Sequence, residues 1–565
     1  MKKFFALTTM ATAMVLAGCG GGGDININAQ NNSTTTSTGG GNGGSTSANG
    51  CASYSTSGGI TRQGADSGVN CVYGPDFVSL TNPIDIGPST PVVFTKLANG
   101  GVHVFRDSLV VGRNYSSDAD LVAAGIAKGG DGSKIEIEAG TTLAFQSSDD
   151  YVVINRGSQI FAEGTASAPI TITSVSDAVD GTVGAEEVQA WGGMIINGFG
   201  LTNKCAYTGS PATNDLATTA SGCHVAAEGK AGGGQTHYGG ANNADSSGSL
   251  KYFIVKHTGA QVEEGNELNG ISFDAVGSGT TVDFLQAYST YDDGVEMFGG
   301  AVNINHYIAM YVRDDSIDID EGYSGTFDYA LVIQSETDGN HCVESDGIGS
   351  YSSKDQATID DFVARGLNSR ATIKNMTCIM SSNDGPAGTA AGLGTHDPGA
   401  GMRIREAHFP IIQNALITSA YQGDVLTGDD DYNYCVRIES AEGLKAADDG
   451  DLVIEGSIIA CSDLTKGDNL PSGKTQLEFI NLKSQALHTL ESGEDPTAAS
   501  NANLDILDGF YSLPVASMKV GGAAPTVSPV AGRAFFGAVV KDDDWTAGWA
   551  YGIDPANRGE PLWFE

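Results

Sequence analysis

The chain has 565 residues, of which 29 are Lys or Arg and 68 are Asp or Glu, so its formal net charge is −39. This charge excludes a nucleic-acid-binding protein that depends on a basic surface, because phosphate would be repelled over most of the molecule. Hydrophobic residues make up 40% of the chain and glycines number 78, which permits a packed core and argues against a mainly disordered chain.

The first segment has the pattern of an export signal. Two lysines precede an apolar run over 4–16, which is too short for a stable membrane span. The sequence LAGC at 16–19 follows and resembles the bacterial lipobox, in which the cysteine is acylated. The resemblance implies a lipoprotein signal peptide over 1–18 and a lipid on Cys19. Because Gly20 comes next, it also implies an outer-membrane lipoprotein, which we expect at the cell surface. An ordinary signal peptide with an incidental cysteine is the alternative.

The next segment is a predicted tether. Residues 20–50 consist almost entirely of Gly, Ser, Thr and Asn, with almost nothing apolar to bury. About thirty residues of such a coil have a root-mean-square reach of about 30 Å, enough to hold a folded body clear of lipid headgroups. We assign 19–71 to the lipidated cysteine and the tether, and 72–534 to the folded body.

Eight cysteines follow Cys19, an even number in a chain that carries an export signal. This favours disulfides over catalytic thiols, and the absence of a C-x-x-C pair gives no support to redox or zinc-ribbon chemistry. Many pairings are open in principle. The cysteines fall in sequence as four close pairs, which favours Cys51–Cys71, Cys205–Cys223, Cys342–Cys378 and Cys435–Cys461.

The body consists of short runs with alternating apolar residues. Runs such as SKIEIEAGTTLAFQ, GSLKYFIVKHTG and DLVIEGSIIAC are β-branched, of strand length, and bounded by Gly, Asn, Asp or Ser. Helical periodicity is scarce, and the best candidate is 118–128, where Ser116 or Ser117 can cap the helix. The pattern predicts an all-β body, either a sandwich, a propeller or a solenoid.

An internal repeat favours the solenoid. The segment YDDGVEMFGG at 291–300 aligns without gaps with RDDSIDIDEG at 313–322. Such a repeat is typical of a parallel β-helix, whose coils stack at about 4.8 Å, whereas hairpins of a sandwich give no vertical register. A looser copy, TDGNHCVESD at 337–346, extends the column. Alternation then predicts that four apolar residues point inward and three acids point outward. The former are Val295, Met297, Ile317 and Ile319, and the latter are Glu296, Asp318 and Asp320.

The chain resembles a family of bacterial cell-surface proteins, secreted or lipid-anchored, with a pectate-lyase-like β-helix. The DDG-x-E-x-FGG block and the DWTAGW sequence near the C-terminus are the most specific of the matching segments. The others are WGGMIING, HYGG, SGSLKYFIVKHTG, DDSIDIDEGYSG and MRIREAHFPIIQNALI. The resemblance implies a single-stranded right-handed parallel β-helix over most of 135–560, and it supplies no catalytic residues.

The final segment, 535–565, is predicted to cap the solenoid. An open β-helix end exposes unpaired backbone groups and must be covered. Trp545, Trp549 and Trp563 supply large apolar side chains for such a cap. Stacking of these rings on sugars is the alternative.

The repeat stacks acids on acids, which suggests a metal site. Carboxylates one coil apart repel one another unless a cation bridges them or some stay protonated. Oxygen-only ligands favour Ca²⁺ over transition metals. A solvated acidic face is the alternative. The candidate ligands are Asp292, Asp293, Glu296, Asp314, Asp315, Asp318 and Asp320.

The best-known chemistry of the implied fold is polysaccharide β-elimination, in which Ca²⁺ neutralises a uronate and an Arg or Lys acts as base. The candidate bases are Arg313, which precedes the acidic block, and Arg403 and Arg405, which alternate onto one face. Salt bridging within an acidic surface is the simpler interpretation of these residues. A polyuronate would also be repelled by this chain unless metal inverted the local field.

The sequence therefore predicts a non-enzymatic surface lipoprotein, a disulfide-stapled and Ca²⁺-stabilised recognition scaffold. Its partners would be the membrane, through Cys19, and a glycan, a protein partner or a nutrient complex, with an outer-membrane protein among the candidates and nucleic acid excluded. The alternative is a Ca²⁺-dependent polysaccharide lyase or related carbohydrate-active enzyme, and the third interpretation is a structural or adhesive surface protein.

Overall fold

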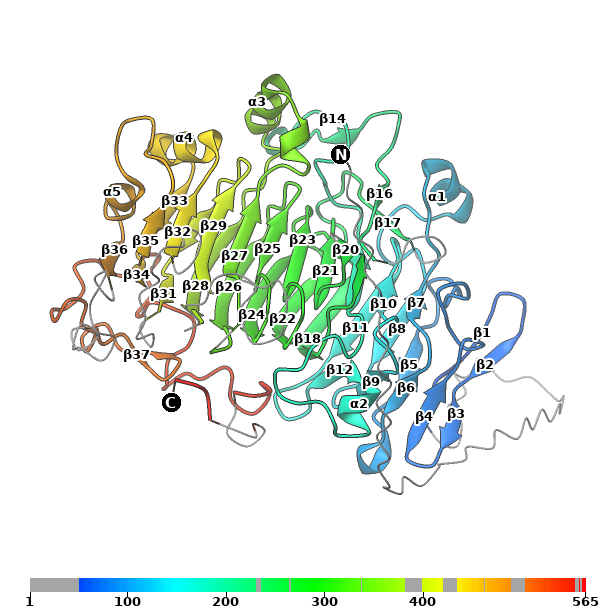
Figure 1. The fold of residues 1–565 in the computed structure, drawn as a ribbon. Helices are drawn as coiled ribbons and strands as arrows, with labels where there is room; N and C mark the ends of the chain where they lie inside the picture. The colour runs from blue at the N-terminus through cyan, green and yellow to red at the C-terminus, as the bar shows by residue number, and fades with distance from the viewer. Residues whose placement is uncertain are drawn as a thin grey trace, which may run out of the picture. The chain divides into compact units, whose positions relative to one another are not determined.

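The computed structural model describes residues 50–229, 235–263, 266–336, 338–381, 399–419, 434–461, 463–488, 504–553, 558 and 561–564. The predicted signal peptide, the predicted lipidation site Cys19 and most of the predicted tether lie outside these residues. No helix within the described ranges is long and apolar enough to cross a membrane. Strands dominate these ranges, and most of them run parallel in two large sheets (Figure 1).

The first sheet has ten strands, all parallel, and it follows the chain order without exception. From β7 to β35, successive coils each contribute one strand to it (Figure 1). Its strands are β7 (Leu109–Val111), β10 (Val152–Ile154), β13 (Met194–Asn197), β21 (Ile271–Asp274), β23 (Val295–Phe298), β25 (Asp318–Asp320), β27 (His341–Asp346), β29 (Ala400–Arg405), β32 (Tyr434–Ile438) and β35 (Asp463–Lys466).

Within the described ranges the second sheet has eighteen strands, and from β5 to β34 each coil contributes either one long strand or two short ones in line. Its long strands are β18 (Gly248–Lys256), β22 (Thr281–Tyr288), β24 (Asn303–Met310), β26 (Thr326–Ile333) and β28 (Thr372–Ile379). Its short strands are β3 (Ala65–Ser67), β4 (Asn70–Tyr73), β5 (Val92–Phe94), β6 (His103–Phe105), β8 (Lys134–Ile137), β9 (Thr142–Phe145), β11 (Gln159–Glu163), β12 (Ile170–Ser174), β30 (Ile411–Gln413), β31 (Leu416–Thr418), β33 (Val453–Glu455), β34 (Ile458–Cys461) and β36 (Gln485–His488).

The register confirms the repeat predicted from the sequence. Strands β23 and β25 pair in parallel with Glu296 opposite Asp318 and Met297 opposite Ile319, as the alignment of the two segments predicts. The four apolar residues predicted to point inward have no exposed surface and belong to one continuous interior core. The body is therefore an all-β parallel β-helix, as predicted.

A stack of rings fills the interior of the N-terminal coils. The ring centroids of Tyr73 and Phe105 are 4.8 Å apart, and those of Phe105 and Phe145 are 5.1 Å apart. Trp191 continues the stack at 4.9 Å from Phe145, and its indole N–H donates to the carbonyl of Lys256. Equivalent positions in successive coils carry like side chains because they lie directly above one another.

The long strands bend at a residue with left-handed backbone geometry. At this bend φ lies between 47° and 59° in six successive coils. Such geometry is unfavourable for residues other than glycine, and stacking of neighbouring side chains at the same position offsets the cost. The centroid distances are 4.2 Å for Tyr252 to Phe284, 4.3 Å for Phe284 to His306, and 4.9 Å for His306 to Tyr329. The bend residues are Tyr252, Phe284, His306, Tyr329, Asn375 and Asn414.

The four disulfides form the predicted neighbouring pairs. Two of them lie inside the core and connect the two large sheets: Cys342–Cys378 joins β27 to β28, and Cys435–Cys461 joins β32 to β34. The Cys51–Cys71 bond lies at the first coil, and Cys205–Cys223 lies in an insertion.

The folded body begins earlier than residue 72, the start predicted from the sequence. Strands β1 (Ser53–Ser55) and β2 (Thr61–Gln63) form an antiparallel pair, and β3 pairs with β4. The backbone N–H of Ala52 donates to the hydroxyl of Tyr73, and Tyr54 is buried. Residues 51–71 contain few apolar side chains, so composition alone did not indicate that the disulfide and these aromatic contacts would order them.

Among the described residues, five short α-helices lie outside the two sheets: α1 (Asp118–Ala124), α2 (Val175–Ala178), α3 (Gln356–Arg365), α4 (Ala441–Asp449) and α5 (Gln476–Ile480). The helix predicted over 118–128 corresponds to α1, and it is shorter because Gly125 takes a left-handed conformation at its C-terminus. Ser117 caps it by accepting a hydrogen bond from the backbone N–H of Asp120. The 3₁₀ helices are η1 (Ala98–Gly100), η2 (Pro211–Thr213) and η3 (Tyr351–Ser353).

An insertion over 198–247 separates β13 from β18 and carries two small antiparallel hairpins. Its contacts with Phe298 and Glu321 place it over the outer face of the ten-stranded sheet. Its strands are β14 (Tyr207–Thr208), β15 (Ala217–Thr218), β16 (Val225–Ala226) and β17 (His237–Tyr238), and a further hairpin, β19 (Gln261–Glu263) with β20 (Asn266–Glu267), precedes β21.

The C-terminal segment covers a side of the β-helix, whereas the sequence predicted a cap over its end. Trp549 is buried in a cluster with outward side chains of β18 to β28, and Gln286 exchanges two hydrogen bonds with the backbone of Tyr551. At the last coils Phe479 and Ile480 of α5 join the interior core instead. Alternation leaves apolar side chains on both faces of the second sheet, so its outer face also needs a cover. A short hairpin, β37 (Leu507–Asp508) with β38 (Tyr511–Ser512), precedes this segment.

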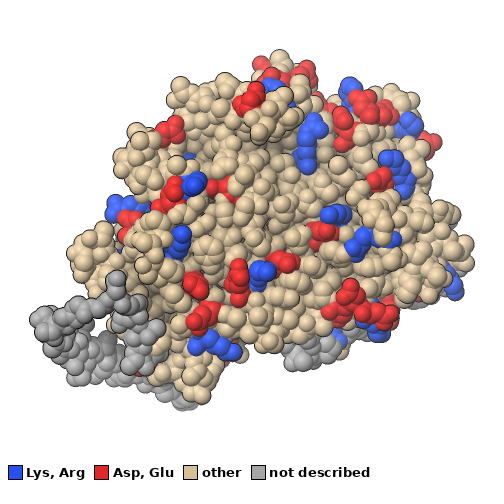
Figure 2. All heavy atoms as spheres, turned by 180° about the vertical axis from the view of Figure 1, so that it is seen from behind, with Lys and Arg blue, Asp and Glu red and all other residues tan. Residues whose placement is uncertain are grey.

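On the face seen in Figure 2, Lys and Arg side chains lie next to Asp and Glu side chains in small mixed groups, with wide uncharged areas between them. This distribution agrees with the ion pairs of the described surface, such as Lys374 with Asp328 at 3.0 Å.

Candidate cation-binding face

Six successive strands of the ten-stranded sheet carry a charged residue at one register position. Glu296 pairs with Asp318, and Asp318 pairs with Glu344. The next two strands continue the column with Arg403 and Arg437. Side chains in register on parallel strands share a face about 4.8 Å apart. Lys466 on β35 pairs with Arg437 and extends the column to a sixth strand, so it changes from three acidic residues to three basic ones along the coil axis.

A second column runs along the turn before each strand, and the backbone of the following coil holds it in place. Asn269 Oδ1 accepts from the N–H of Asp293 at 3.2 Å, and Asp293 Oδ1 accepts from the N–H of Asp315 at 3.1 Å. Asp315 Oδ1 accepts in turn from the N–H of His341 at 2.9 Å. The aspartates of the repeat are thus ordered by local hydrogen bonds, which turn their remaining oxygens toward the neighbouring column.

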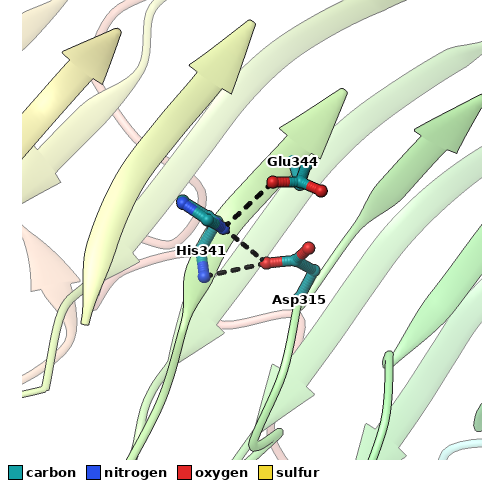
Figure 3. Close-up of side chains that lie close together, drawn as sticks. All are labelled: Asp315, His341 and Glu344. Carbon is teal, nitrogen blue, oxygen red and sulfur yellow. Dashed lines mark hydrogen bonds and ion pairs between the residues drawn. The ribbon is translucent and has the colours of Figure 1, made fainter. Parts of the chain in front are cut away.

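Figure 3 shows the cluster of Asp315, His341 and Glu344. His341 Nδ1 lies 2.8 Å from Asp315 Oδ1 and 3.6 Å from Glu344 Oε1, and its Nε2 lies 3.0 Å from the hydroxyl of Tyr434. Burial lowers the pKa of His341, which favours the neutral ring. Its partners assign the tautomer: Nδ1–H donates to Asp315, and Nε2 accepts from Tyr434.

Two further clusters consist of carboxylates alone. One joins Asp292, Asp293 and Asp314, and the other joins Asp293, Glu296 and Asp318. In each cluster one oxygen from every residue lies within 4.8 Å of the others. Asp293 belongs to both, so a continuous acidic surface connects the two columns over neighbouring coils. We call these residues and the Asp315 cluster the acidic ladder.

The electrostatic cost of the acidic ladder is high. Burial, followed by neighbouring carboxylates, raises the pKa of Asp293, Glu296 and Asp315 well above the usual range. Asp293 and Asp315 are only 6% and 5% exposed, so water screens their repulsion weakly. No described Lys or Arg forms an ion pair with Asp293, Glu296 or Asp318. The ladder must therefore take up protons or a cation.

The structure brings together six of the seven predicted metal ligands. Asp292, Asp293, Glu296, Asp314, Asp315 and Asp318 all lie in the acidic ladder. The seventh, Asp320, accepts a hydrogen bond from the backbone N–H of Glu321 at 2.5 Å and lies outside the three clusters.

Sequence reasoning missed His341 and Glu344 as members of the site. Both lie in the looser copy of the repeat at 337–346, which was recognised as part of the column. The separation between paired residues is longer there, since Asp318 pairs with Glu344, than in the preceding coil, where Glu296 pairs with Asp318. Because this coil is longer, a gapless alignment does not show which of its side chains lies opposite Asp318. The copy of the repeat nevertheless indicated that the coil belongs to the column.

The three arginines predicted as bases occupy two different environments. Arg403 and Arg405 lie on the outer face of the ten-stranded sheet beside the ladder: Arg403 contacts Glu344 at 3.1 Å, and Arg405 contacts it at 2.6 Å. Arg313 instead contacts Asp338 at 3.5 Å and donates to the backbone carbonyl of Glu186. Geometry therefore groups only Arg403 and Arg405 with the acidic ladder.

Replacing Arg405 by glutamine should destabilise the fold. The substitution leaves Glu344 and Asp346 without their closest charged partner, since Arg405 Nε lies 2.5 Å from Asp346 Oδ1. Loss of charge-assisted hydrogen bonds of this kind costs about 1.5–3 kcal/mol of unfolding free energy. Denaturant unfolding would measure the change. Lys445→Gln is the control, because Lys445 pairs with Asp449 at an exposed site and should cost almost nothing. Equal stability of the two variants would contradict a structural role for Arg405.

The insertion adds an acid to the rim of this face. Burial raises the pKa of Glu228 to about 7, and nearby Glu267 and Glu321 contribute in the same direction while Lys204 opposes them. Glu228 in turn raises the pKa of Glu296, so it faces the acidic ladder from the covering segment. The insertion and the sheet thus form two sides of one acidic region.

The parallel coils and the charged outer face define a parallel β-helix protein with a polar lateral face. Residues 123–449 match the family described as the pectate-lyase-like β-helix domain, so the chain belongs to that family. The crystal structure of the Dettilon tailspike protein is similar at 10% sequence identity and a TM-score of 0.20, covering 74% of this chain and 68% of that chain. No curated protein matches the sequence.

Proposed function

We propose that this protein is a non-enzymatic recognition scaffold at the cell surface, and that its ligand face is the outer face of the ten-stranded sheet. The observation that carries the proposal is the column from Glu296 to Lys466, in which three acidic positions are followed by three basic ones. An extended ligand lying along the coil axis would meet both signs of charge at a spacing of about 4.8 Å.

Calcium completes this face in our proposal. The two all-carboxylate clusters offer oxygen ligands only, which a hard cation prefers over a transition metal. A divalent ion would offset the repulsion that raises the pKa of Asp293 and Glu296. It would also place a positive charge in the acidic half of the column.

The predicted lipid anchor supports a location at the outer membrane. The lipobox-like sequence at 16–19 and the tether that follows support an outer-membrane lipoprotein whose body stands clear of the headgroups. Such a body would present its lateral face to a glycan, a nutrient complex or an outer-membrane protein. An exported location also agrees with four disulfides.

A Ca²⁺-dependent polysaccharide lyase is the second candidate, and the position of Arg403 and Arg405 beside the acidic ladder favours it. Both side chains are already paired with Glu344. Burial lowers the pKa of Arg405, but pairing with Glu344 and Asp346 outweighs burial and raises it. A guanidinium held in its protonated form is a poor general base. This chemistry is why the binding role ranks first.

One experiment separates these functions. The folded protein is immobilised and exposed to polyuronates and neutral polysaccharides, with Ca²⁺ or with a chelator, while ultraviolet absorbance follows unsaturated products. Ca²⁺-dependent retention without product supports the scaffold, and product formation supports the lyase. Asp318→Asn should abolish retention, whereas Asp328→Asn, on the outer face of the other sheet, should leave it unchanged. Retention that survives both the chelator and Asp318→Asn would contradict the proposal.

A further inference from the structure

Asp274 is a buried carboxylate whose oxygens lack a hydrogen-bond donor among the described residues. It ends strand β21, has no exposed surface, and neither of its oxygens has a partner within the described ranges. Asn197 is its register neighbour on β13, is 1% exposed, and has a side-chain oxygen that likewise lacks a described partner. Two register neighbours thus carry three acceptor oxygens without a donor from the described part of the chain.

The neighbouring carboxylate of Glu321, unlike that of Asp274, has polar partners from the insertion. Glu321, also fully buried, accepts from the hydroxyls of Thr202 at 2.5 Å and Tyr238 at 2.8 Å, and it forms an ion pair with Lys204. These three side chains of the insertion therefore contact Glu321 and donate no hydrogen bond to Asp274. Burial, followed by Glu321 and Glu228, raises the pKa of Asp274 well above its usual range.

The insertion over 198–247 closes this position from outside. Asn197 Nδ2 donates to Thr236 of the insertion at 3.1 Å. On the other side of Asp274 lies its register neighbour Phe298, whose ring is 6.1 Å from that of Tyr238 and 5.8 Å from the ammonium of Lys204. Asp274 and Asn197 consequently lie where the insertion packs against the sheet.

Protonation of Asp274 alone does not give all three oxygens a hydrogen-bond partner. Protonated Asp274 would have one O–H to donate, which pairs at most one further acceptor and leaves the second Asp274 oxygen without a partner. A cation contacts several oxygens at once and also offsets the negative charges of Glu321 and Glu228. Carboxylate and amide oxygens together are ligands that Ca²⁺ takes in proteins.

We propose a structural Ca²⁺ site formed by Asp274 and Asn197 beneath the insertion, separate from the acidic ladder, which fastens the insertion to the ten-stranded sheet. The site does not depend on the proposed recognition function. It lies one register column away from the Glu296 column, and its two ligands belong to earlier coils. Its role is to hold one rim of the outer face in place.

The test compares the metal-stripped full protein with Asp274→Asn and Asp318→Asn. Bound Ca²⁺ per chain is measured by elemental analysis after gel filtration, and hydrogen exchange reports protection of the insertion. Asp274→Asn should bind one ion fewer, or bind it more than about tenfold more weakly, and should lose the Ca²⁺-dependent protection. It should also unfold at a higher temperature than wild type in chelator, because it removes an unpaired buried charge. Unchanged stoichiometry and unchanged protection would overturn the proposal.

Asn197→Asp keeps the test decisive if Asp274→Asn perturbs the fold. A second carboxylate beside Asp274 should destabilise the chelated protein and should be tolerated when Ca²⁺ is present. Equal destabilisation with and without Ca²⁺ would contradict a site there.

The Asp318→Asn variant of the acidic ladder distinguishes a failure of the buried site from a failure of the proposed function. If Asp318→Asn loses an ion and Asp274→Asn binds as wild type does, the recognition face stands and the buried site fails. The reverse result would remove the metal from the face and keep the structural site.

Discussion

The metal-free protein should lose stability as the pH rises above about 4, and Ca²⁺ should restore it. Carboxyl groups titrate near pH 4 in an unfolded chain. In the folded protein burial, then neighbouring carboxylates, raises the pKa of Asp293, Glu296 and Asp315 well above that value. At pH values between the pKa of an unfolded carboxyl group and the raised pKa of the folded protein, the native chain binds more protons than the unfolded chain. The free energy of unfolding therefore falls with rising pH.

Calcium should reverse this trend because it competes with protons for the same oxygens. One ion bound at a hundred times its dissociation constant adds about 2.7 kcal/mol to the free energy of unfolding. Thermal unfolding from about pH 4 to about pH 8, in chelator and in Ca²⁺, would measure both effects. Asp293→Asn should flatten the pH dependence in chelator, and Asp328→Asn should not. Stability that rises with pH in chelator would contradict the raised pKa values.

Removal of the Cys342–Cys378 disulfide should weaken both the fold and the cation site. Cys342 lies next to His341 on β27, and its bond to Cys378 crosses the core to the other large sheet. Replacing both cysteines by alanine should lower the free energy of unfolding by about 2–4 kcal/mol. It should also lower Ca²⁺ affinity, because β27 carries Glu344 at the edge of the acidic ladder.

The matched control is the Cys51–Cys71 pair, which lies at the first coil. Its replacement by alanine should lower stability and leave Ca²⁺ affinity unchanged, since its strands carry no residue of the ladder. Denaturant unfolding and calorimetric titration of each variant would provide the two readouts. Equal Ca²⁺ affinity in both variants would show that the interior disulfide does not position the site.

Because the coils repeat regularly, much of the acidic ladder could be predicted from the sequence. Where two segments align without gaps, the position of Glu296 over Asp318 follows from that alignment and from the two-residue period of a strand. The disulfide pairs followed in the same way, because cysteines close in sequence stand on neighbouring strands or turns. Where the coil became longer, between Asp318 and Glu344, the alignment failed to identify the ligand.

Other features depend on contacts between segments far apart in the chain. The C-terminal segment, predicted to cap an end, covers a lateral face through contacts such as Gln286 with Tyr551. The insertion over 198–247 lies on the ten-stranded sheet through contacts such as Thr202 with Glu321. Neither segment repeats, so no periodicity could indicate which surface it would cover.

Local patterns in the chain were enough to predict the parallel β-helix, its inward apolar residues, its disulfide pairs and the stacking of acids on acids, because each follows from a short period or a small separation along the chain. The folded arrangement was needed to show which surfaces are covered, that Arg405 pairs with Glu344, and that Asp274 is buried without a donor among the described residues. These features depend on which nonrepeating segment packs against which coil, and that choice is made by burial of surface across long sequence separations.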